Sequence, residues 1–248
     1  MIPRATKGAA AVRTAPLLSL VIPTRNEREA VPALLNRLQP CLYGIDAELV
    51  FVDDSDDGTE AVLDAARPEQ ELTVLHREAD RRAGGLSTAV ELGFAQARGE
   101  FICVLDADLQ HPPERILDML DAVRDGADVV VASRYLPGGS AAGLDGPVRR
   151  FLSRASCEVT KLVFAGRLRG ISDPLSGFFV VRRDVVAGVR LRPIGFKILL
   201  EVLVRGNWTT ASEVPYCFEG RTAGLSKATL RQGGQFLRHL WRLRFDAP

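Results

Sequence analysis

The feature that most constrains the fold is a regular alternation of two kinds of segment in the first half of the chain. Short apolar runs, which we expect to be strands, are Leu18–Pro23, Leu49–Asp53, Leu72–His76, Phe101–Asp106 and Val129–Ser133. Longer amphipathic segments, which we expect to be helices, are Ala30–Leu38, Thr59–Ala66, Leu86–Arg98 and Pro113–Arg124. This order is typical of parallel strands joined by crossover helices, so the sequence predicts an α/β fold with helices on both faces of a mostly parallel sheet.

The second half is less regular. A Pro- and Gly-rich connection near 137–147 precedes a long amphipathic segment from Val148 to about 169, whose polar positions are largely arginine. An apolar stretch, a helix, an extended stretch and a basic amphipathic end are then expected, at Gly177–Val181, Phe196–Arg205, Glu213–Phe218 and Phe236–Phe245. We therefore divide the chain into a mobile tail (1–16), one domain (17–228) and a basic amphipathic C-terminal segment (229–248).

The polar residues that follow the predicted strands carry the chemistry. Asp106 and Asp108 come directly after a buried run, and strand geometry would place both carboxylates on one face. Two hard oxygen donors can share a divalent cation that neutralises a diphosphate leaving group. Alone, this spacing is equally compatible with a solvated loop that caps the next helix. Ligands of open α/β sheets bind at the carboxyl ends of the strands, so we expect the site there.

The net charge of +1 conceals an asymmetry. Residues 1–124 contain 13 Lys and Arg against 21 Asp and Glu, a net charge of −8, whereas residues 125–248 contain 19 against 10, a net charge of +9. This split suggests a cation site in the first half and anion contacts in the second. The basic half lacks aromatic clusters beside its arginines, which argues against a nucleic-acid-binding module.

Other features narrow the class further. Four scattered cysteines and three histidines make a zinc ribbon or a disulfide scaffold improbable. No apolar run approaches the ~20 residues of a membrane-spanning helix. The first sixteen residues lack the apolar core of a signal peptide. We expect a protein that is neither secreted nor an integral membrane protein.

The sequence resembles the family 2 glycosyltransferases with a Rossmann-like GT-A fold, and within them the dolichol-phosphate or polyprenol-phosphate mannosyltransferase-like enzymes. The resemblance covers roughly residues 17–228 in family order. It is carried by Val21-Ile-Pro-Thr-Arg-Asn-Glu27, Val52-Asp-Asp-Ser55, Asp106-Ala-Asp-Leu-Gln-His-Pro-Pro113, Ala132-Ser-Arg-Tyr135, Ser172-Asp-Pro-Leu-Ser-Gly-Phe-Phe179, Gly195-Phe-Lys-Ile-Leu-Leu-Glu201 and Arg221-Thr-Ala-Gly-Leu-Ser-Lys227.

This resemblance implies a donor site in the first half. The nucleotide sugar would be held by Pro23, Arg25, Glu27, Asp53, Asp54, Gly84, Asp106, Ala107 and Asp108. Carboxylates at 53 or 54 can accept hydrogen bonds from a base or a ribose. Turn chemistry in Asp54-Ser-Asp-Asp-Gly58 is the competing explanation. Mg²⁺ or Mn²⁺ would be bound by Asp106, Asp108 and Gln110, because an all-oxygen ligand set favours these ions.

The resemblance also implies an acceptor site in the basic half. The acceptor phosphate would be bound by Arg134, Arg149, Arg150 and Ser153. The residues expected to act in catalysis are Asp108, Arg134, Arg221 and Lys227. A single arginine on an amphipathic helix is more often a solvated charge, so we expect only one or two contacts among Arg149, Arg150, Ser153, Arg221 and Lys227. Asp173 and Ser176 line the acceptor site or form a turn, and Glu201 has no assigned role.

Two positions depart from the family pattern. Arg25 stands where a tyrosine is common, which removes a stacking surface for the nucleoside. Arg81-Arg-Ala-Gly-Gly-Leu-Ser-Thr88 replaces a Gly-Lys-x-Gly-Leu-Gly run, where Arg82 is the candidate for the missing lysine charge and Gly84-Gly85 still permits close backbone approach.

The expected function is metal-dependent, inverting transfer of a hexose to polyprenyl or dolichyl phosphate, with GDP-mannose as the expected donor. Alternatives are UDP-glucose-dependent transfer to the same acceptor and a catalytically idle nucleotide-sugar-binding subunit. The intact Asp106, Asp108 and Gln110 argue against the idle subunit. We expect a cytoplasmic protein, peripheral on the cytoplasmic face of a membrane, held by its basic amphipathic segments or by a separate transmembrane partner.

Overall fold

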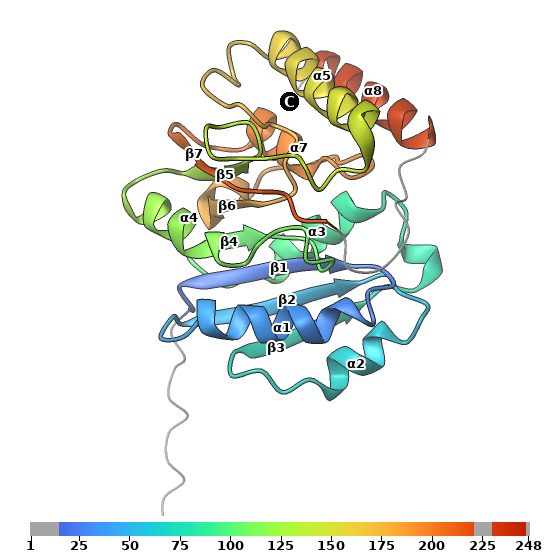
Figure 1. Ribbon diagram of the computed structural model, residues 1–248, viewed down its shortest axis with the longest axis vertical. Coiled ribbons are helices and arrows are strands. Elements are labelled where there is room, and N and C mark those ends of the chain that lie inside the picture. Colours follow the sequence, from blue (N-terminus) through green and yellow to red (C-terminus); the bar gives the residue numbers. More distant parts are fainter. Residues whose placement is uncertain (1–14, 221–229, 247–248) are drawn as a thin grey trace, which may run out of the picture.

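The structure, a computed structural model of the chain, describes residues 15–220 and 230–246. Its centre is a seven-stranded sheet in the order β3-β2-β1-β4-β6-β5-β7, in which only β6 runs antiparallel to its neighbours (Figure 1). The strands are β1 (Leu18–Thr24), β2 (Ala47–Asp53), β3 (Glu71–His76), β4 (Phe101–Val104), β5 (Val129–Ser133), β6 (Phe179–Arg182) and β7 (Ala211–Pro215). The α/β fold predicted from the sequence is confirmed.

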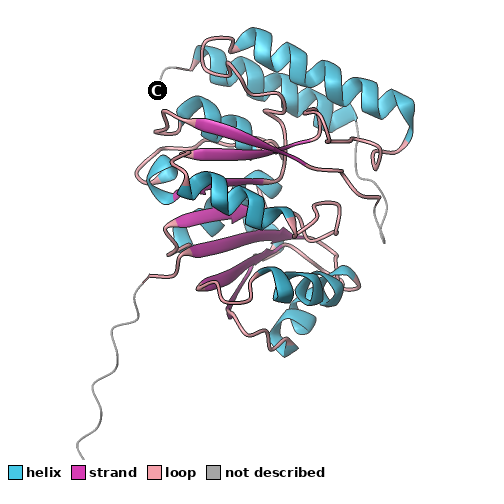
Figure 2. Ribbon diagram, turned by 60° about the vertical axis from the view of Figure 1, so that its left-hand side comes forward, coloured by secondary structure: helices cyan, strands magenta, loops and turns pink. Residues whose placement is uncertain are grey.

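Helices cover both faces of this sheet (Figure 2). They are α1 (Ala30–Cys41), α2 (Thr59–Ala65), the 3-10 helix η1 (Ala79–Arg81), α3 (Leu86–Gln96), α4 (Arg115–Arg124), α5 (Gly146–Val163), α6 (Arg183–Val186), α7 (Ile198–Arg205) and α8 (Leu230–Phe245). The expected helices are all present, with ends that differ by a few residues from the sequence pattern. Helix α1 ends at Cys41, one residue after Pro40, which has no backbone N–H to donate to the preceding turn.

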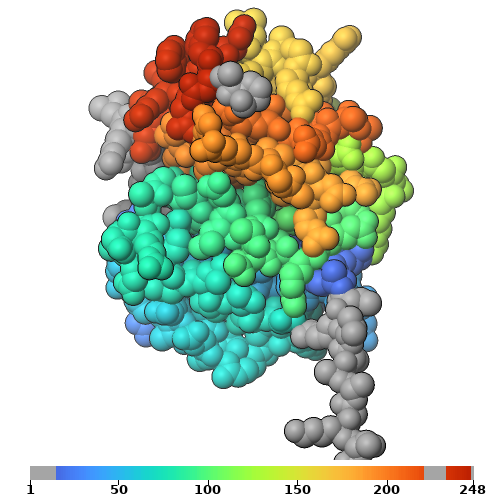
Figure 3. Space-filling view, turned by 180° about the vertical axis from the view of Figure 1, so that it is seen from behind, coloured from blue at the N-terminus to red at the C-terminus, as the bar shows by residue number. Residues whose placement is uncertain are grey.

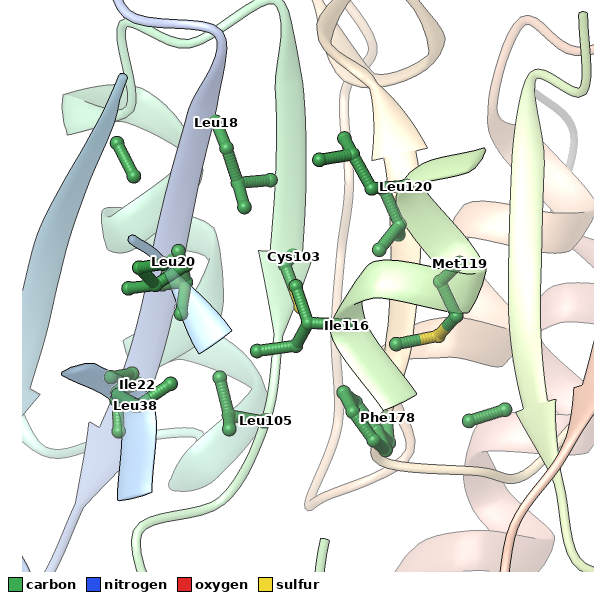
Figure 4. Close-up of a cluster of buried hydrophobic side chains, with 14 of the residues drawn as sticks. Leu18, Leu20, Ile22, Leu38, Cys103, Leu105, Ile116, Met119, Leu120 and Phe178 are labelled. Atoms are coloured by element: carbon green, nitrogen blue, oxygen red, sulfur yellow. The ribbon is translucent and has the colours of Figure 1, made fainter. Parts of the chain in front are cut away.

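The helices pack on the sheet through two apolar cores, one on each face. On one face, α1, α2 and α4 pack against β1, β2 and β4, and Figure 4 shows Ile116, Met119 and Leu120 of α4 beside Cys103 and Phe178. On the other face, α3, α7 and part of α8 pack against the alternate side chains of the same strands. Strands β1, β2, β4 and β5 are buried on both faces, which explains their largely apolar sequences, whereas the edge strands β3 and β7 are partly exposed.

Strand β4 is shorter than predicted, and this corrects the geometry expected of the two aspartates. The strand ends at Val104, so Asp106 and Asp108 lie in the following loop rather than on one face of a strand. The loop turns sharply at Leu109, a non-glycine residue with a φ of 63°. The relative position of the two carboxylates is therefore set by a turn and not by strand periodicity.

Helices α5 and α8 lie side by side at one end of the molecule (Figures 1 and 2). Helix α5 buries Cys157 and Thr160, while five of its large apolar residues are exposed: Val148, Phe151, Leu152, Val159 and Leu162. Helix α8 buries His239, Leu240 and Leu243. Among the described residues, no helix is both long enough and apolar enough to cross a bilayer.

Candidate active site at the carboxyl edge of the sheet

The sheet topology brings the sequence motifs to one edge. Strands β2, β1 and β4 are parallel neighbours, and their ends precede the loops at 25–29, 54–58 and 105–111. Strand β5 ends at the same edge with Ser133 and Arg134. Strand β6 is antiparallel, so its beginning lies there too, preceded by the motif at 172–177. The expectation that the polar residues share the carboxyl edge is confirmed for the residues described.

The predicted donor residue Pro23 lies within β1, and the loop that follows β1, which contains Arg25 and Glu27, is hydrogen-bonded to the loop after β2. The backbone N–H of Asn26 donates to Ser55 Oγ at 2.8 Å, and that of Glu27 donates to Thr59 Oγ1 at 3.1 Å. The side chain of Asn26 accepts from the Asp56 backbone N–H at 3.0 Å. Asn26 has a positive φ of 56°, a conformation that asparagine tolerates better than most residues. Three hydrogen bonds therefore join the two loops.

The carboxylates of Asp53 and Asp54 are buried and already paired. Asp53 accepts from Ser55 Oγ at 2.5 Å and lies 2.8 Å from His76 Nδ1. That contact raises the pKa of His76, although partial burial opposes the shift. Asp54 binds Arg77 in a bidentate pair at 2.7 and 2.6 Å. These contacts tie β2 to β3, so both aspartates have a structural role whether or not they also contact a nucleoside.

The departure at residues 81–88 has a clear local structure. Arg82, the candidate for the missing lysine charge, donates to both oxygens of Asp56 at 2.7 Å and to two backbone carbonyls. Gly84 has a φ of 89°, and a Cβ there would lie 2.3 Å from Thr88 Cγ2. The backbone conformation and the close contact favour glycine at this position. Local structure therefore accounts for Gly84, whether or not it also binds the donor.

Asp106, Ala107, Asp108 and Gln110 occupy one compact loop. The Gln110 backbone N–H donates to Asp108 Oδ1 at 3.1 Å, and the Gln110 side-chain amide donates to the Glu219 carbonyl at 3.1 Å. Asp108 is buried, whereas Asp106 is partly exposed. No group of three or more histidine, cysteine or acidic residues that could hold a metal gathers within the described residues.

The donor set nevertheless fits the ion expected from the sequence. Asp106 and Asp108 provide two carboxylates in one short loop, and Mg²⁺ commonly binds one or two protein carboxylates together with substrate phosphates and waters. The Gln110 amide, which is held by Glu219, fixes the loop. Mg²⁺ or Mn²⁺ at this loop would complete its coordination with the diphosphate of a nucleotide sugar.

Arg134 lies within a buried network rather than on an open surface. Its guanidinium donates to both oxygens of Asp173 at 2.7 and 2.8 Å. Burial opposes ionisation, but the pair with Asp173 raises the pKa of Arg134 and lowers that of Asp173. The arginine predicted to meet an acceptor phosphate thus has a carboxylate partner 39 residues away in the chain. Its contact with phosphate stays a prediction.

A second polar network supports the loop at 172–177, which contains Asp173. Glu213 of β7 accepts from the backbone N–H groups of Ser172 and Asp173 at 2.9 and 3.2 Å, and Ser172 Oγ lies 2.5 Å from Ser133 Oγ. Lys197, from the motif at 195–201, donates to the Leu175 carbonyl at 2.8 Å. Burial, reinforced by the nearby Arg134, lowers the pKa of Lys197 to about 8. These contacts favour a structural role for Asp173 in shaping the turn.

Of the predicted acceptor residues on α5, the structure joins only Ser153 to the segment next to Arg134 by a hydrogen bond. Ser153 Oγ lies 2.8 Å from the hydroxyl of Tyr135, next to Arg134. Arg149 forms an ion pair with Asp145 at 3.0 Å, and Arg150 is exposed. Arg221 and Lys227, predicted as catalytic, lie outside the described residues. Arg134 of the predicted acceptor set follows β5 directly, and Ser153 is joined to the same segment from α5 through its hydrogen bond to Tyr135.

Sequence reasoning missed two residues that organise this edge. Arg77 is buried and joins Asp54 to Thr88 and to the Gly85 carbonyl. His111 is buried and hydrogen-bonded to the Asp106 backbone. A basic residue directly after a strand and a histidine inside an aspartate-rich motif are the signals that could have identified them.

The mostly parallel sheet with helices on both faces agrees with the GT-A fold that the sequence resembles. The family described as "Glycosyl transferase family 2" matches residues 19–188. The chain belongs to this family.

Curated relatives agree with this assignment. A protein named dolichol-phosphate mannosyltransferase from Pyrococcus furiosus is 40% identical over 227 residues, which cover 91% of this chain and 63% of that protein. A Saccharomyces cerevisiae protein with the same name is 34% identical and covers 91% and 86% of the two chains. The polyprenol monophosphomannose synthase of Mycolicibacterium smegmatis is 33% identical and covers 88% and 83%. The chain thus spans less than two thirds of the archaeal relative.

Solved structures agree with the fold. Mannosyl-3-phosphoglycerate synthase from Rubrobacter xylanophilus has a TM-score of 0.68 at 22% identity, and the match covers 92% of this chain and 74% of that one. Glucosyl-3-phosphoglycerate synthase from Mycobacterium tuberculosis, solved with Mn²⁺, UDP-glucose and glycerol 3-phosphate, has a TM-score of 0.64 at 19% identity and covers 94% and 81%. At these identities the likeness establishes the fold alone.

Proposed function

We propose that this chain transfers mannose from GDP-mannose to polyprenyl phosphate in a metal-dependent reaction at a membrane surface. The observation that carries the proposal is the loop containing Asp106 and Asp108, in a chain 33–40% identical to three relatives named as mannosyltransferases of dolichol or polyprenol phosphate. The structural neighbour solved with Mn²⁺ and a nucleotide sugar supports a divalent ion in this fold.

The chemistry follows from the charges. A phosphate monoester has a second pKa near 6, so its attacking oxygen is ionised at neutral pH and needs no strong general base. This oxygen attacks the anomeric carbon, the bond from that carbon to the diphosphate breaks, and GDP leaves. One in-line displacement inverts the anomeric centre, as the family resemblance implies. A bound metal ion would offset the charge that develops on the diphosphate.

The chain's own residues supply alignment and charge. Asp106 and Asp108 would bind the cation, and the braced loops after β1 and β2 would hold the nucleoside. Arg149, Arg150 and Ser153 would bind the acceptor phosphate from the opposite side, with Arg134, Arg221 and Lys227. Positioning of this kind contributes strongly to rate enhancement when the reacting groups are both anionic.

The test of this proposal is metal-dependent turnover of the donor. Wild-type protein with GDP-mannose, Mn²⁺ and a short-chain polyprenyl phosphate should release GDP, and the variant Asp108→Ala should be at least 100-fold slower. Asp118→Asn is the matched control, because Asp118 is an exposed aspartate of α4 paired with Arg115. Equal rates for wild type and Asp108→Ala would contradict the assignment of the site. UDP release from UDP-glucose in place of GDP release would favour the glucosyl alternative.

A membrane-facing surface is the second part of the proposal. Among the described residues, ten large apolar side chains are exposed, and eight of them lie on α5 and α8. These eight define the α5–α8 surface: Val148, Phe151, Leu152, Val159, Leu162, Leu237, Trp241 and Phe245. Figure 3 shows both helices gathered at one end of the molecule.

Basic residues accompany this surface. Arg150, Arg154, Arg238 and Arg244 are exposed on the same two helices. Exposed apolar side chains flanked by arginine are typical of helices that lie in the interface of an anionic membrane. Helix α5 also carries the predicted acceptor residues, so this contact would present a membrane-held phosphate to the site. Flotation with phosphatidylglycerol vesicles tests direct binding, and failure to float at low salt would leave recruitment by a partner protein as the route.

A further inference from the structure

His111 is a buried histidine to which the proposed reaction assigns no step. Its Nδ1 accepts a hydrogen bond from the backbone N–H of Asp106 at 3.0 Å, and its side chain is 2% exposed. The bond joins the two ends of the loop from Asp106 to His111, inside which Leu109 has its positive φ. The histidine therefore closes the loop that contains the three candidate metal ligands Asp106, Asp108 and Gln110.

The imidazole ring has little freedom to move. Its centroid lies 5.3 Å from the stacked ring of Phe178, and 5.8 and 5.7 Å from the edge-on rings of Tyr216 and Phe218. On another side, the backbone at Gly177 is so close that an added Cβ would lie 3.1 Å from His111 Cε1 and 3.4 Å from Asp106 Oδ2. The acceptor atom is thus fixed by packing from several elements of the fold.

We infer that His111 is a positioning residue that sets the Asp106 backbone, and through it the Asp106 carboxylate, in the orientation needed to bind the divalent cation. The inference rests on the metal-dependent function proposed above. Loss of an outer-shell hydrogen-bond partner of a metal ligand typically weakens metal affinity by about 10- to 100-fold, and we expect an effect of this size where the partner holds the ligand's backbone.

The competing explanation is that His111 acts only as a packing group. Two substitutions separate these roles because each retains one property of histidine. His111→Phe preserves an aromatic ring among Phe178, Tyr216 and Phe218 but has no acceptor for the Asp106 N–H. His111→Asn loses the ring but places a carbonyl oxygen at the same number of bonds from Cβ as Nδ1.

The experiment measures Mn²⁺ affinity by electron paramagnetic resonance in the presence of GDP, without sugar or lipid. We expect His111→Phe to bind Mn²⁺ about 10- to 100-fold more weakly than wild type, and His111→Asn to recover at least part of that loss. Tyr216→Phe is the matched control, because it alters a ring neighbour of His111 without touching the Asp106 hydrogen bond, and its Mn²⁺ affinity should match that of wild type. Circular dichroism establishes that each variant is folded.

The possible outcomes are distinct. Equal Mn²⁺ affinities for wild type and His111→Phe would overturn the inference and leave the proposed transferase function standing. Weaker binding by His111→Asn than by His111→Phe would assign His111 to packing and would also overturn it. If wild-type protein bound no Mn²⁺ or Mg²⁺, the metal dependence of the proposed function would fail, and this inference with it. Mannose transfer that fails in a protein with the expected affinity order would instead refute only the proposed substrates.

Discussion

Helices α4 and α5 are both amphipathic, yet they present opposite faces to the protein. Helix α4 buries its apolar residues Ile116, Met119, Leu120 and Val123 against the sheet. Helix α5 buries Cys157 and Thr160 and exposes Phe151 and Leu162, which are 71% and 80% accessible. Apolar residues recur with the same helical period in both helices, but most of them are buried in α4, whereas most are exposed to solvent in α5. An outward-facing apolar stripe of this kind is typical of an interaction surface, in agreement with the membrane contact proposed above.

The neighbouring helix α8 sharpens this comparison, since a buried charge cluster fastens it to the fold. Glu201 of α7 lies 2.7 Å from His239 Nε2 of α8, accepts from the Arg192 backbone N–H at 2.6 Å, and pairs with Arg205 at 3.1 Å. Glu201, which the sequence left without a role, thus holds in place a helix that carries part of the exposed apolar surface.

The largest effect on stability is expected at this cluster. Glu201→Gln keeps the shape of the side chain but removes its charge beside Arg205 and His239. Breaking a buried ion pair in this way costs about 3–5 kcal/mol of the free energy of unfolding, which urea denaturation at pH 7 can measure. Glu158→Gln is the matched control on α5, where the exposed pair with Lys161 contributes at most about 1 kcal/mol. Similar losses for the two variants would show that Glu201 is not a structural anchor.

The same cluster predicts a pH dependence. Burial alone would raise the pKa of Glu201, but the hydrogen bonds from His239 and the Arg192 backbone lower it overall. A group with a lowered pKa in the folded state stabilises the fold above its unfolded pKa, about 4.3 for glutamate, and loses that contribution as the pH falls through the folded value. The difference in unfolding free energy between wild type and Glu201→Gln should therefore shrink in acid below about pH 4.3. A difference that grows in acid would contradict this account.

The inward face of α4 should be nearly as sensitive. Ile116→Ala removes a fully buried side chain and is expected to cost about 2–5 kcal/mol. Phe151→Ala, on the outward face of α5, is expected to change the free energy of unfolding by less than about 0.5 kcal/mol. The pair of denaturation curves tests the comparison between the helices directly. A cost above 2 kcal/mol for Phe151→Ala would mean that α5 is covered in the folded protein.

For membrane association, in contrast to stability, substitutions on the exposed face of α5 should have a larger effect than a substitution on α4. Placing a charge on the exposed apolar surface, as in Phe151→Glu or Leu162→Glu, should weaken binding to phosphatidylglycerol vesicles at least about tenfold, since a carboxylate is poorly tolerated among acyl chains and is repelled by anionic lipid. Leu117→Glu supplies the control, because Leu117 is also an exposed leucine but lies on α4. Vesicle sedimentation measures all three. Equal weakening by Leu117→Glu would indicate a general charge effect rather than a defined surface.

Local patterns in the sequence predicted the strands and the longer helices of this fold but not the short helices η1 and α6. The β-branched runs predicted the strands because both faces of the sheet are buried, and the family motifs indicated the edge at which the polar residues gather. The direction of α5 could not be predicted, because a 3.6-residue period identifies an apolar stripe without indicating what covers it.

Ion pairs between residues far apart in the chain could not be predicted from the sequence either. The pairs Asp54–Arg77 and Arg134–Asp173 join residues 23 and 39 positions apart. Such pairs depend on which strands become neighbours, which no local pattern contains. The end of β4 at Val104 was missed for a related reason, since the turn that carries Asp106 and Asp108 is held by contacts from His111 and Glu219.

The most direct measurement of the central claim is a competition between donors in one reaction. Wild-type protein is incubated with ³H-labelled GDP-mannose, ¹⁴C-labelled UDP-glucose, Mn²⁺ and vesicles that contain polyprenyl phosphate, and the lipid is then extracted into organic solvent. The account predicts that ³H enters the lipid fraction, that ¹⁴C does not, and that a chelator abolishes the transfer. Lipid labelled with ¹⁴C alone, or no labelled lipid under conditions where the protein is folded and binds GDP, would contradict it.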